Sequence, residues 1–215
     1  MSGDPRAVGI RDGYAPVAAA YAEELSGELA GKPLDRAFLD AYAEVTRGAG
    51  RVVEIGCGPG QIAAYLHARG VAVEGLDLSP EMVAEATARH PGVAFCVGDM
   101  FALPYGDGAL AGVVAFYAIV HAPTADLPRP IAELARVLAP GGLAAIAFHA
   151  GSEQIHLDAM FGRPTALDFW FHAPEAVAAA LEAAGLVIEA RLDRAPYPGV
   201  EHASRRTYLL ARRPR

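Results

Sequence analysis

The sequence predicts an α/β fold built on one doubly wound, mostly parallel sheet of seven strands. Three observations predict it. From residue 51 onward, short apolar runs typical of buried strands alternate with helical stretches, which favours parallel strands with helices on both faces. A glycine-rich loop joins the first of these strands to a helix. The chain ends on two strands with no helix between them, which predicts a hairpin and one antiparallel strand.

The composition is that of a globular domain. The chain has 215 residues, 53% hydrophobic and 20% charged, which argues against disorder and fits one domain. The net charge of −7 weighs against nucleic acid as a partner, because proteins that grip phosphates present a basic surface. The two cysteines, Cys57 and Cys96, fit neither a disulfide framework nor a zinc site.

The sequence shows no segment that favours export or membrane insertion. Residues 1–6 lack a basic stretch followed by an apolar core, and no apolar run reaches the roughly 20 residues that span a bilayer. We therefore expect a cytoplasmic protein with no membrane partner.

The first 48 residues are expected to form a helical cap. Side chains at Tyr14, Tyr21 and Leu25 recur at helical spacing, so a helix is predicted from Tyr14 onward. The Gly-Lys-Pro segment at 31–33 breaks this helix, and a second helix is predicted over 34–45.

The alternating region has clear start and stop signals. Ser79 suits a helix N-cap and Pro80 the first helical position, while Gly70 and Gly185 favour helix ends. The expected strands cover residues 51–55, 71–76, 93–97, 112–118, 143–148, 187–192 and 207–211. The expected helices cover residues 61–69, 127–138 and 174–184, with one more opening at residues 79–81.

The segment 150–173 is long for a connection between a strand and a helix. Long loops in compact domains are often functional, so we expect it to form one wall of a substrate pocket. His156 and Trp170 are the candidate substrate contacts, with Trp170 as a flat apolar face. A surface hairpin packed over the sheet is the alternative. The expected single domain, 1–215, thus comprises a cap (1–48), a core (49–149), this insertion (150–173) and a C-terminal helix and hairpin (174–215).

The strongest motif is the loop Glu54-Ile55-Gly56-Cys57-Gly58-Pro59-Gly60. Glycines at alternate positions let the backbone turn sharply and approach a ligand closely. A dinucleotide-binding loop needs a different spacing, with a glycine where this chain has Gln61, and a P-loop lysine is absent. The spacing therefore weighs against an NAD-dependent oxidoreductase.

Two carboxylates follow at strand ends. Ligands of open α/β sheets bind beyond the carboxyl ends of the strands, and Asp77 ends the second strand. A carboxylate there is placed to accept hydrogen bonds from two ribose hydroxyls. Asp99, in Gly98-Asp99-Met100 after the third strand, is placed to accept from an adenine amine, with Met100 against the ring.

With these motifs the chain resembles the class I S-adenosylmethionine (SAM)-dependent methyltransferases, which have a Rossmann-like fold. Within them it is similar to the small bacterial "methyltransferase domain 11" type found in quinone and biotin synthesis. The matching segments are residues 52–60, 75–82, 98–100, 103–105 and 135–142. The resemblance implies SAM as cofactor and a small-molecule methyl acceptor as partner, and it is almost silent on which one. The cofactor-binding residues it implies are Tyr14, Tyr21, Glu54, Gly56, Cys57, Gly58, Gly60, Asp77, Leu78, Met82, Gly98, Asp99, Met100 and Phe116.

Individual roles follow from the same resemblance. Glu54 orders the glycine loop, Leu78 and Met82 lie near the adenine, and Phe116 with Tyr117 lies beside the sulfonium. An aromatic face is favourable there through cation–π attraction. Plain core packing is the alternative for these two rings. Tyr14 and Tyr21 are candidates to close over the cofactor, with packing on the sheet as their alternative.

Methyl transfer is an in-line displacement that needs alignment and, for a hydroxyl acceptor, a base. The candidate catalytic residues are His121, His149 and Tyr117, because both histidines follow strand ends at the ligand edge and histidine titrates near neutral pH. No metal site is expected. The protein is expected to be a monomer or homodimer. A SAM-binding protein that does not transfer methyl groups is the alternative function.

Overall fold

The N-terminal cap consists of three α-helices and a short 3₁₀ helix. We describe the protein from a computed structural model, over residues 4–215. The first helix begins at Pro5 and ends at Tyr14, which corrects the prediction of a helix starting at Tyr14. The Asp4 carboxylate accepts from the Arg6 N–H and caps this helix, and Pro5 is its first residue. The cap elements are α1 (Pro5–Tyr14), α2 (Ala18–Leu25), η1 (Glu28–Gly31) and α3 (Pro33–Thr46).

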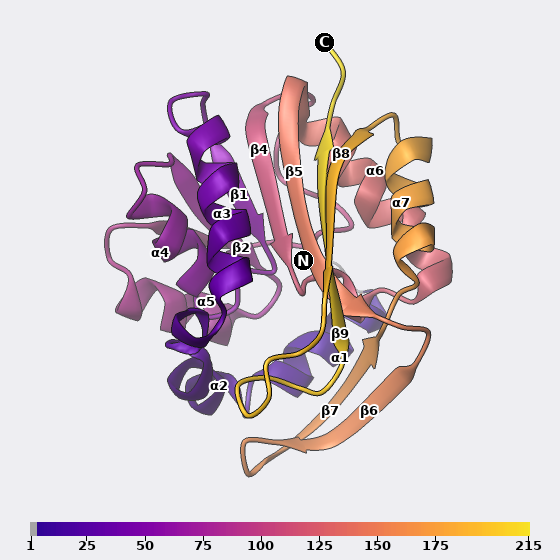
Figure 1. The fold of residues 1–215 in the computed structure, drawn as a ribbon. Helices are drawn as coiled ribbons and strands as arrows, with labels where there is room; N and C mark the ends of the chain where they lie inside the picture. The colour runs from indigo at the N-terminus through magenta and orange to yellow at the C-terminus, as the bar shows by residue number, and fades with distance from the viewer. Residues whose placement is uncertain (1–3) are drawn as a thin grey trace.

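The central sheet has seven strands in the order β3-β2-β1-β4-β5-β9-β8 (Figure 1). β9 runs antiparallel to both β5 and β8, and the other pairs are parallel, which confirms the predicted Rossmann-like sheet. Its strands are β1 (Val52–Ile55), β2 (Val73–Asp77), β3 (Ala94–Val97), β4 (Leu110–Phe116), β5 (Leu138–Ala150), β8 (Val187–Arg194) and β9 (Arg205–Arg212). β5 begins at Leu138, earlier than predicted, since the Pro-Gly-Gly segment continues the strand through a register shift opposite β4.

Helices bury both faces of the sheet. Leu39 and Tyr42 of α3 join Leu66 of α4 in one apolar cluster, and Ile131 of α6 joins Leu181 of α7 in the other. Alternate residues of the central strands enter the two clusters, so these strands are mainly apolar, with Glu54 of β1 as a buried exception. The helices are α4 (Gln61–His67), α5 (Pro80–Arg89), α6 (Pro128–Val137) and α7 (Pro174–Ala183), and 3₁₀ turns η2 (Ile119–His121) and η3 (Thr124–Asp126) follow β4.

The segment 150–173 forms an antiparallel hairpin of β6 (Gln154–Met160) and β7 (Arg163–Trp170). The hairpin holds the cap. The Thr165 hydroxyl donates to the Gly13 carbonyl of α1 over 2.6 Å. Gly13 lies so close to β7 that a Cβ atom on it would be 2.5 Å from Leu167 Cδ2. The end of α1, which carries Tyr14, is therefore fixed against β7.

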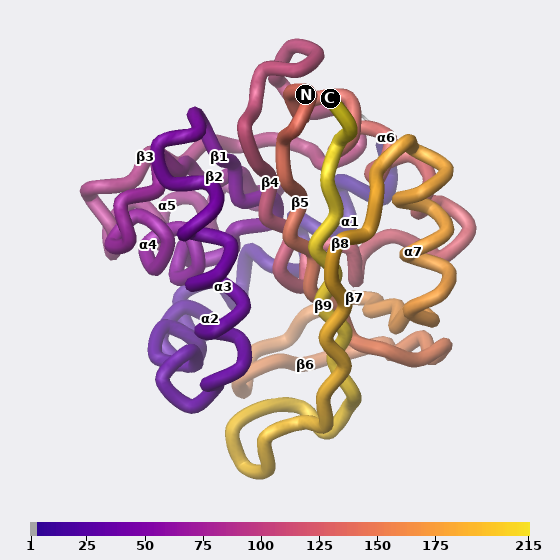
Figure 2. Tube along the Cα trace, turned by 45° about the horizontal axis from the view of Figure 1, so that its top comes forward, coloured from indigo at the N-terminus to yellow at the C-terminus, as the bar shows by residue number. Residues whose placement is uncertain are grey.

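Four segments far apart in sequence gather at one end of the sheet. Figures 1 and 2 both show α2, the β6–β7 hairpin and the connection between β8 and β9 below the sheet, with α1 crossing behind the hairpin in Figure 1. This end carries the carboxyl ends of the parallel strands, where ligands of such sheets bind. Within residues 4–215, every helix is too short or too polar to cross a membrane.

Candidate active site

The glycine loop after β1 adopts the conformation that its sequence predicts. Gly56, Gly58 and Gly60 have φ angles of 66°, 50° and 83°, a region that favours glycine. At Gly56 a Cβ would also lie 2.6 Å from the Cβ of Ala118, so the loop passes close to the segment after β4. The three glycines let the backbone turn directly from β1 into α4.

Glu54 anchors this loop from below. Its side chain is buried, and its Oε2 accepts from the Ala63 N–H in the first turn of α4 over 2.7 Å. Burial raises the pKa of its carboxyl well above the ordinary value, and the bond from Ala63 opposes that rise. Glu54 therefore ties β1 to the helix that follows the loop.

Asp77, at the end of β2, holds the loop from the other side. Its Oδ2 accepts from the Gly58 N–H over 2.7 Å, and its Oδ1 accepts from the Ser79 N–H over 2.9 Å. Burial raises the pKa of this carboxyl, against the effect of the backbone donors. A carboxylate has about four lone-pair positions, so acceptor capacity is left for a ligand in the cavity beside it.

A cavity of about 100 Å³ lies between the glycine loop and the cap. It brings together almost every predicted cofactor residue. Those that line it are Tyr14, Tyr21, Glu54, Gly56, Cys57, Gly58, Asp77, Leu78, Met82, Gly98, Asp99, Met100 and Phe116, and the candidate catalytic residues Tyr117 and His121 line it too. Gly60 is the exception, because it faces Phe95 and Ala86. Ligand pockets usually exceed about 300 Å³, so this cavity is small for one when the cap lies as it does here.

Arg6 closes this cavity and was missed from the sequence. Its guanidinium donates to Asp99 Oδ2 over 2.6 Å and lies over the Phe101 ring, 3.8 Å from its centroid. Asp99 Oδ1 meanwhile accepts from the Phe101 N–H. Asp99 is thus engaged with the cap, and its role toward an adenine amine stays a prediction. The capping signal of Asp4-Pro5 would have indicated a helix here.

A second cavity, of about 580 Å³, adjoins the first. Four residues line both cavities: Tyr14, Tyr21, Glu28 and Tyr117. The inward side of the hairpin forms an apolar wall from Ile155, Leu157, Met160, Phe161, Phe169 and Phe171. The insertion thus lines a cavity beside the first one, as a substrate wall would.

The hairpin does not bring His156 and Trp170 to this cavity, which corrects the choice of these two residues. Neighbouring residues of a strand point to opposite faces, and the inward positions are those of Ile155 and Phe169. His156 is exposed and bonds across the hairpin to the Asp168 carboxylate over 2.9 Å. The alternation of apolar and polar residues in β6 was the signal that would have separated the two faces.

His121 lies where Tyr14 reaches it from the cap. It is buried, and its Nδ1 lies 3.0 Å from the Asp168 carbonyl oxygen, which can only accept a hydrogen bond. Nδ1 therefore carries the proton, and Nε2 accepts from the Tyr14 hydroxyl over 2.7 Å. Burial lowers the pKa of His121 to about 4, so the ring is neutral near pH 7.

His149, at the end of β5, has the opposite arrangement. Its Nδ1 lies 2.7 Å from Ser204 Oγ, and Ser204 Oγ also accepts from Arg206. Among the described residues the Ser204 hydroxyl has no acceptor other than Nδ1, so its hydrogen is assigned to that contact, and the His149 proton is then on Nε2. Burial, followed by the nearby Arg206 charge, lowers the pKa of His149 to about 3. Of the two candidate bases, His121 presents an acceptor nitrogen and His149 a donor.

These two histidines predict how stability depends on pH. Their folded pKa values lie below the unfolded value of 6.5, so the unfolded chain binds protons that the folded chain does not. The stability that these two histidines contribute is complete above pH 6.5 and falls as the pH drops toward 4, by about 1.4 kcal/mol per pH unit for each histidine. Denaturant unfolding between pH 7.5 and 4.5 measures the slope. His121→Gln is expected to reduce the slope of stability against pH by the contribution of one proton. His67→Gln, at an exposed position, is expected to leave the slope that His121 and His149 contribute unchanged.

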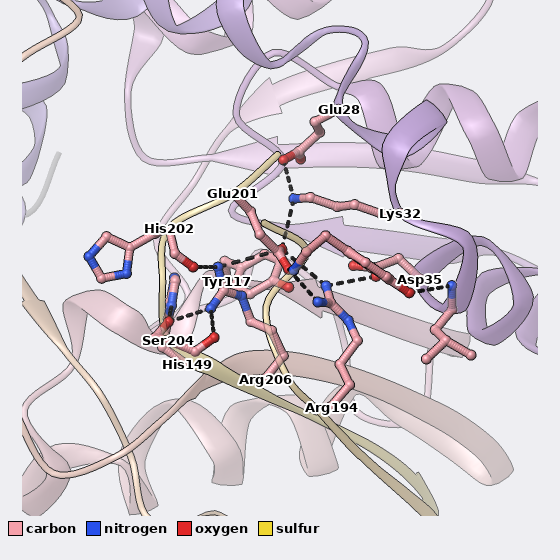
Figure 3. A network of polar contacts seen from close by, with 12 residues as sticks. Glu28, Lys32, Asp35, Tyr117, His149, Arg194, Glu201, His202, Ser204 and Arg206 are labelled. Carbon is pink, nitrogen blue, oxygen red and sulfur yellow. Dashed lines mark hydrogen bonds and ion pairs between the residues drawn. The ribbon is translucent and has the colours of Figure 1, made fainter. Parts of the chain in front are cut away.

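Tyr117 is held in an unusual conformation beside a buried ionic network. Its φ is 59°, which is uncommon outside glycine and recurs at functional sites. Its hydroxyl lies 3.1 Å from that of Tyr208, which donates to Asp35 over 2.7 Å. Figure 3 shows the surrounding charges, which no local sequence pattern indicated. They are Glu28, Lys32, Asp35, Arg194, Glu201 and Arg206.

Within residues 4–215, no group of three or more His, Cys, Asp or Glu side chains is placed to hold a metal ion.

Comparison with known proteins identifies the core. Residues 52–142, from β1 into β5, match the methyltransferase domain family. This chain contains a class I SAM-dependent methyltransferase domain. The methyltransferase domain takes SAM as its cofactor, and the matched segment carries the glycine loop, Asp77 and Asp99.

The methyltransferase domain has relatives of several kinds. It is 46% identical over 101 residues to a trans-aconitate 2-methyltransferase of Methylobacterium nodulans, covering 45% of this chain and 37% of that protein. The chain spans about half the length, or less, of the curated relatives it matches. A SAM-dependent methyltransferase of Methanosarcina mazei shares the fold with a TM-score of 0.68 at 18% identity, over 76% of this chain and 92% of that one. The [4+2]-cyclase SpnF also shares the fold, with a TM-score of 0.59 at 23% identity, over 81% and 80% of the two chains.

Proposed function

We propose that this protein transfers a methyl group from SAM to a small-molecule acceptor and releases S-adenosylhomocysteine. The observation that carries the proposal is the pair of adjoining cavities. The first is lined by the glycine loop, Asp77 and Asp99, and the second is an apolar chamber of about 580 Å³. That volume suits a small molecule and not a nucleic acid strand or a folded protein.

The cofactor roles belong to the same proposal. Asp77 binds the ribose hydroxyls, Leu78 and Met82 contact the adenine, and Phe116 lies beside the sulfonium. Phe116 lines the first cavity and also packs against the Phe38 ring, so packing and cofactor contact are compatible at this position. Asp99 has lone pairs beyond those that accept from Arg6 and Phe101, and one of these accepts from the adenine amine.

The acceptor reaches the methyl group where the cavities meet. Tyr14, Tyr21 and Tyr117 line both cavities, and burial raises the pKa of each hydroxyl above the ordinary value, so each stays protonated near pH 7. These rings exclude water from the line of displacement, and alignment supplies most of the rate enhancement that such a reaction needs. We propose further that the protein works in the cytoplasm.

A second candidate is a SAM-binding protein that does not transfer the methyl group. The likeness of the fold to the [4+2]-cyclase SpnF favours keeping it, because a fold does not determine a reaction.

Product analysis separates the two candidates. The protein is incubated with methyl-labelled SAM and a panel of small acids, phenols and amines, and labelled product and S-adenosylhomocysteine are measured together. Equal amounts of both, above the level without acceptor, are expected. Stoichiometric SAM binding with neither product across the panel would favour the non-transferring candidate. Failure to bind millimolar SAM would contradict both.

A further inference from the structure

The second cavity combines an apolar body with one polar end. The hairpin wall is apolar, and Leu25, Val120 and Val200 add to it from other elements. The polar end is formed by β9, the end of β5 and the connection between β8 and β9. Its side chains are His149, Glu201, His202 and Arg206, joined by Lys32 and its partner Glu28 from the cap. A ligand that fills this cavity therefore has an apolar body and a polar group at one end.

The polar end has an unpartnered donor. Arg206 is 98% buried, as its exposed fraction is 2%. Its terminal nitrogens donate to the Ser204 carbonyl and hydroxyl and to the His202 carbonyl. Its Nε has no hydrogen-bond partner among the described residues. Arg206 Nη2 also lies 3.5 Å from Glu201 Oε2, but a buried N–H without an acceptor is unfavourable, which favours a ligand that supplies one at Nε.

His149 supplies a second donor beside the first. Arg206 and His149 share the Ser204 hydroxyl, and that sharing places the His149 proton on Nε2. The His149 ring is stacked on Phe171, with centroids 4.6 Å apart and planes 9° from parallel. No hydrogen bond reaches Nε2 from residues 4–215. The two donors are thus fixed by packing and by a common partner.

The charges around this pair favour one negative charge on the ligand. Burial lowers the pKa of His149 most, the charges of Arg206, His202 and Lys32 lower it further, and Glu201 raises it, so most of the charged groups around the ring favour an anion beside it. The wider network balances the cations Lys32, Arg194 and Arg206 against three carboxylates. A singly charged group is therefore accommodated more readily than a doubly charged one.

We propose that Arg206 and His149 anchor the acceptor by a carboxylate, and that the acceptor is therefore an apolar or aromatic monocarboxylic acid. This inference rests on the proposed function, since it names the substrate class of the second cavity. The anchor lies beside the junction of the cavities. Arg206 is 5.6 Å from the Tyr117 ring centroid, and the His149 and Tyr117 centroids are 5.2 Å apart. The carboxylate end of the acceptor is thus the end nearest the methyl donor.

A matched pair of probes tests the anchor. 2-Naphthoate and 2-naphthalenemethanol have the same apolar body, and only the first carries a carboxylate. Calorimetric titration at pH 7.5, with and without S-adenosylhomocysteine, gives the ratio of their affinities. We expect the acid to bind at least tenfold more tightly. Arg206→Gln reduces that ratio to near one, because the acid loses more affinity than the alcohol does. Arg205→Gln, the same change at the exposed neighbour on β9, keeps the wild-type ratio.

A second variant covers the case in which Arg206→Gln fails to fold. His149→Phe keeps the stack on Phe171 and removes the Nε2 donor together with the Nδ1 contact to Ser204, and it is expected to lower the ratio about threefold or more. A wild-type ratio near one, an acid preference that survives in Arg206→Gln, or binding of neither probe would overturn the anchor. Absence of S-adenosylhomocysteine binding would contradict the proposed function instead, because the ratio of the two probes is also measured without it.

Discussion

Replacing Asp77 with alanine is expected to weaken SAM binding about a hundredfold. Its carboxylate serves two partners at once: the cofactor ribose, as we propose, and the N–H groups of Gly58 and Ser79. Alanine removes the ribose acceptors and leaves two backbone donors without a partner, at about 1–3 kcal/mol for each unpaired buried group. A loss of about 2.7 kcal/mol in binding corresponds to a hundredfold change in Kd. Calorimetry with SAM measures it.

Controls separate ribose binding from loop support. Asp158→Ala removes a carboxylate that is 94% exposed at the hairpin and leaves the SAM affinity unchanged. Asp77→Asn retains one acceptor oxygen and turns an amide toward one of the two N–H groups. Its SAM affinity is therefore expected to lie between those of wild type and Asp77→Ala. Thermal unfolding of each variant reports the state of the loop without cofactor. Unchanged SAM affinity in folded Asp77→Ala would remove the ribose role.

Local sequence signals account for the core of the fold. The period of the apolar residues located all seven strands of the sheet, and the Ser79-Pro80 signal located the start of α5. The glycine loop and Asp77 were predictable because their geometry depends on neighbours in the chain. Gly58 and Asp77 are 19 residues apart, yet both follow adjacent parallel strands, so the strand order alone brings them together.

Features that depend on distant contacts were not predictable in this way. Arg194 pairs with Asp35 across 159 residues, and nothing near either residue indicates a buried partner. Arg6 reaches Asp99 only because α1 folds back over the first cavity. The choice of Trp170 failed for a different reason. Its residue type suited a binding wall, but the side of the hairpin that a strand residue faces is set by its position in the alternation. The alternation places Phe169, and not Trp170, on the cavity side.

Tyr14→Phe and His121→Gln are each expected to lower turnover about a hundredfold, with less effect on SAM affinity. His121 accepts from the Tyr14 hydroxyl, and the Asp168 carbonyl fixes the ring in the tautomer that allows this. The Tyr14 oxygen is thereby held where both cavities meet, with a lone pair available to the acceptor. His121 acts through Tyr14 and is a positioning residue. Tyr14 stays protonated and aligns the acceptor, and a misplacement of about 1 Å can lower a rate about 10²-fold.

A double variant distinguishes this couple from two separate contributions. If Tyr14 and His121 act as one unit, Tyr14→Phe with His121→Gln lowers turnover no further than either change alone, since the second change removes a partner that is already lost. If the losses of turnover in the two single variants multiply in the double variant, each residue acts independently. Because burial holds the pKa of His121 near 4, turnover is expected to show no inflection near pH 6.5 from this ring. Such an inflection that disappears in His121→Gln would mean that the ring titrates during catalysis, and the fixed tautomer would no longer explain how Tyr14 is held.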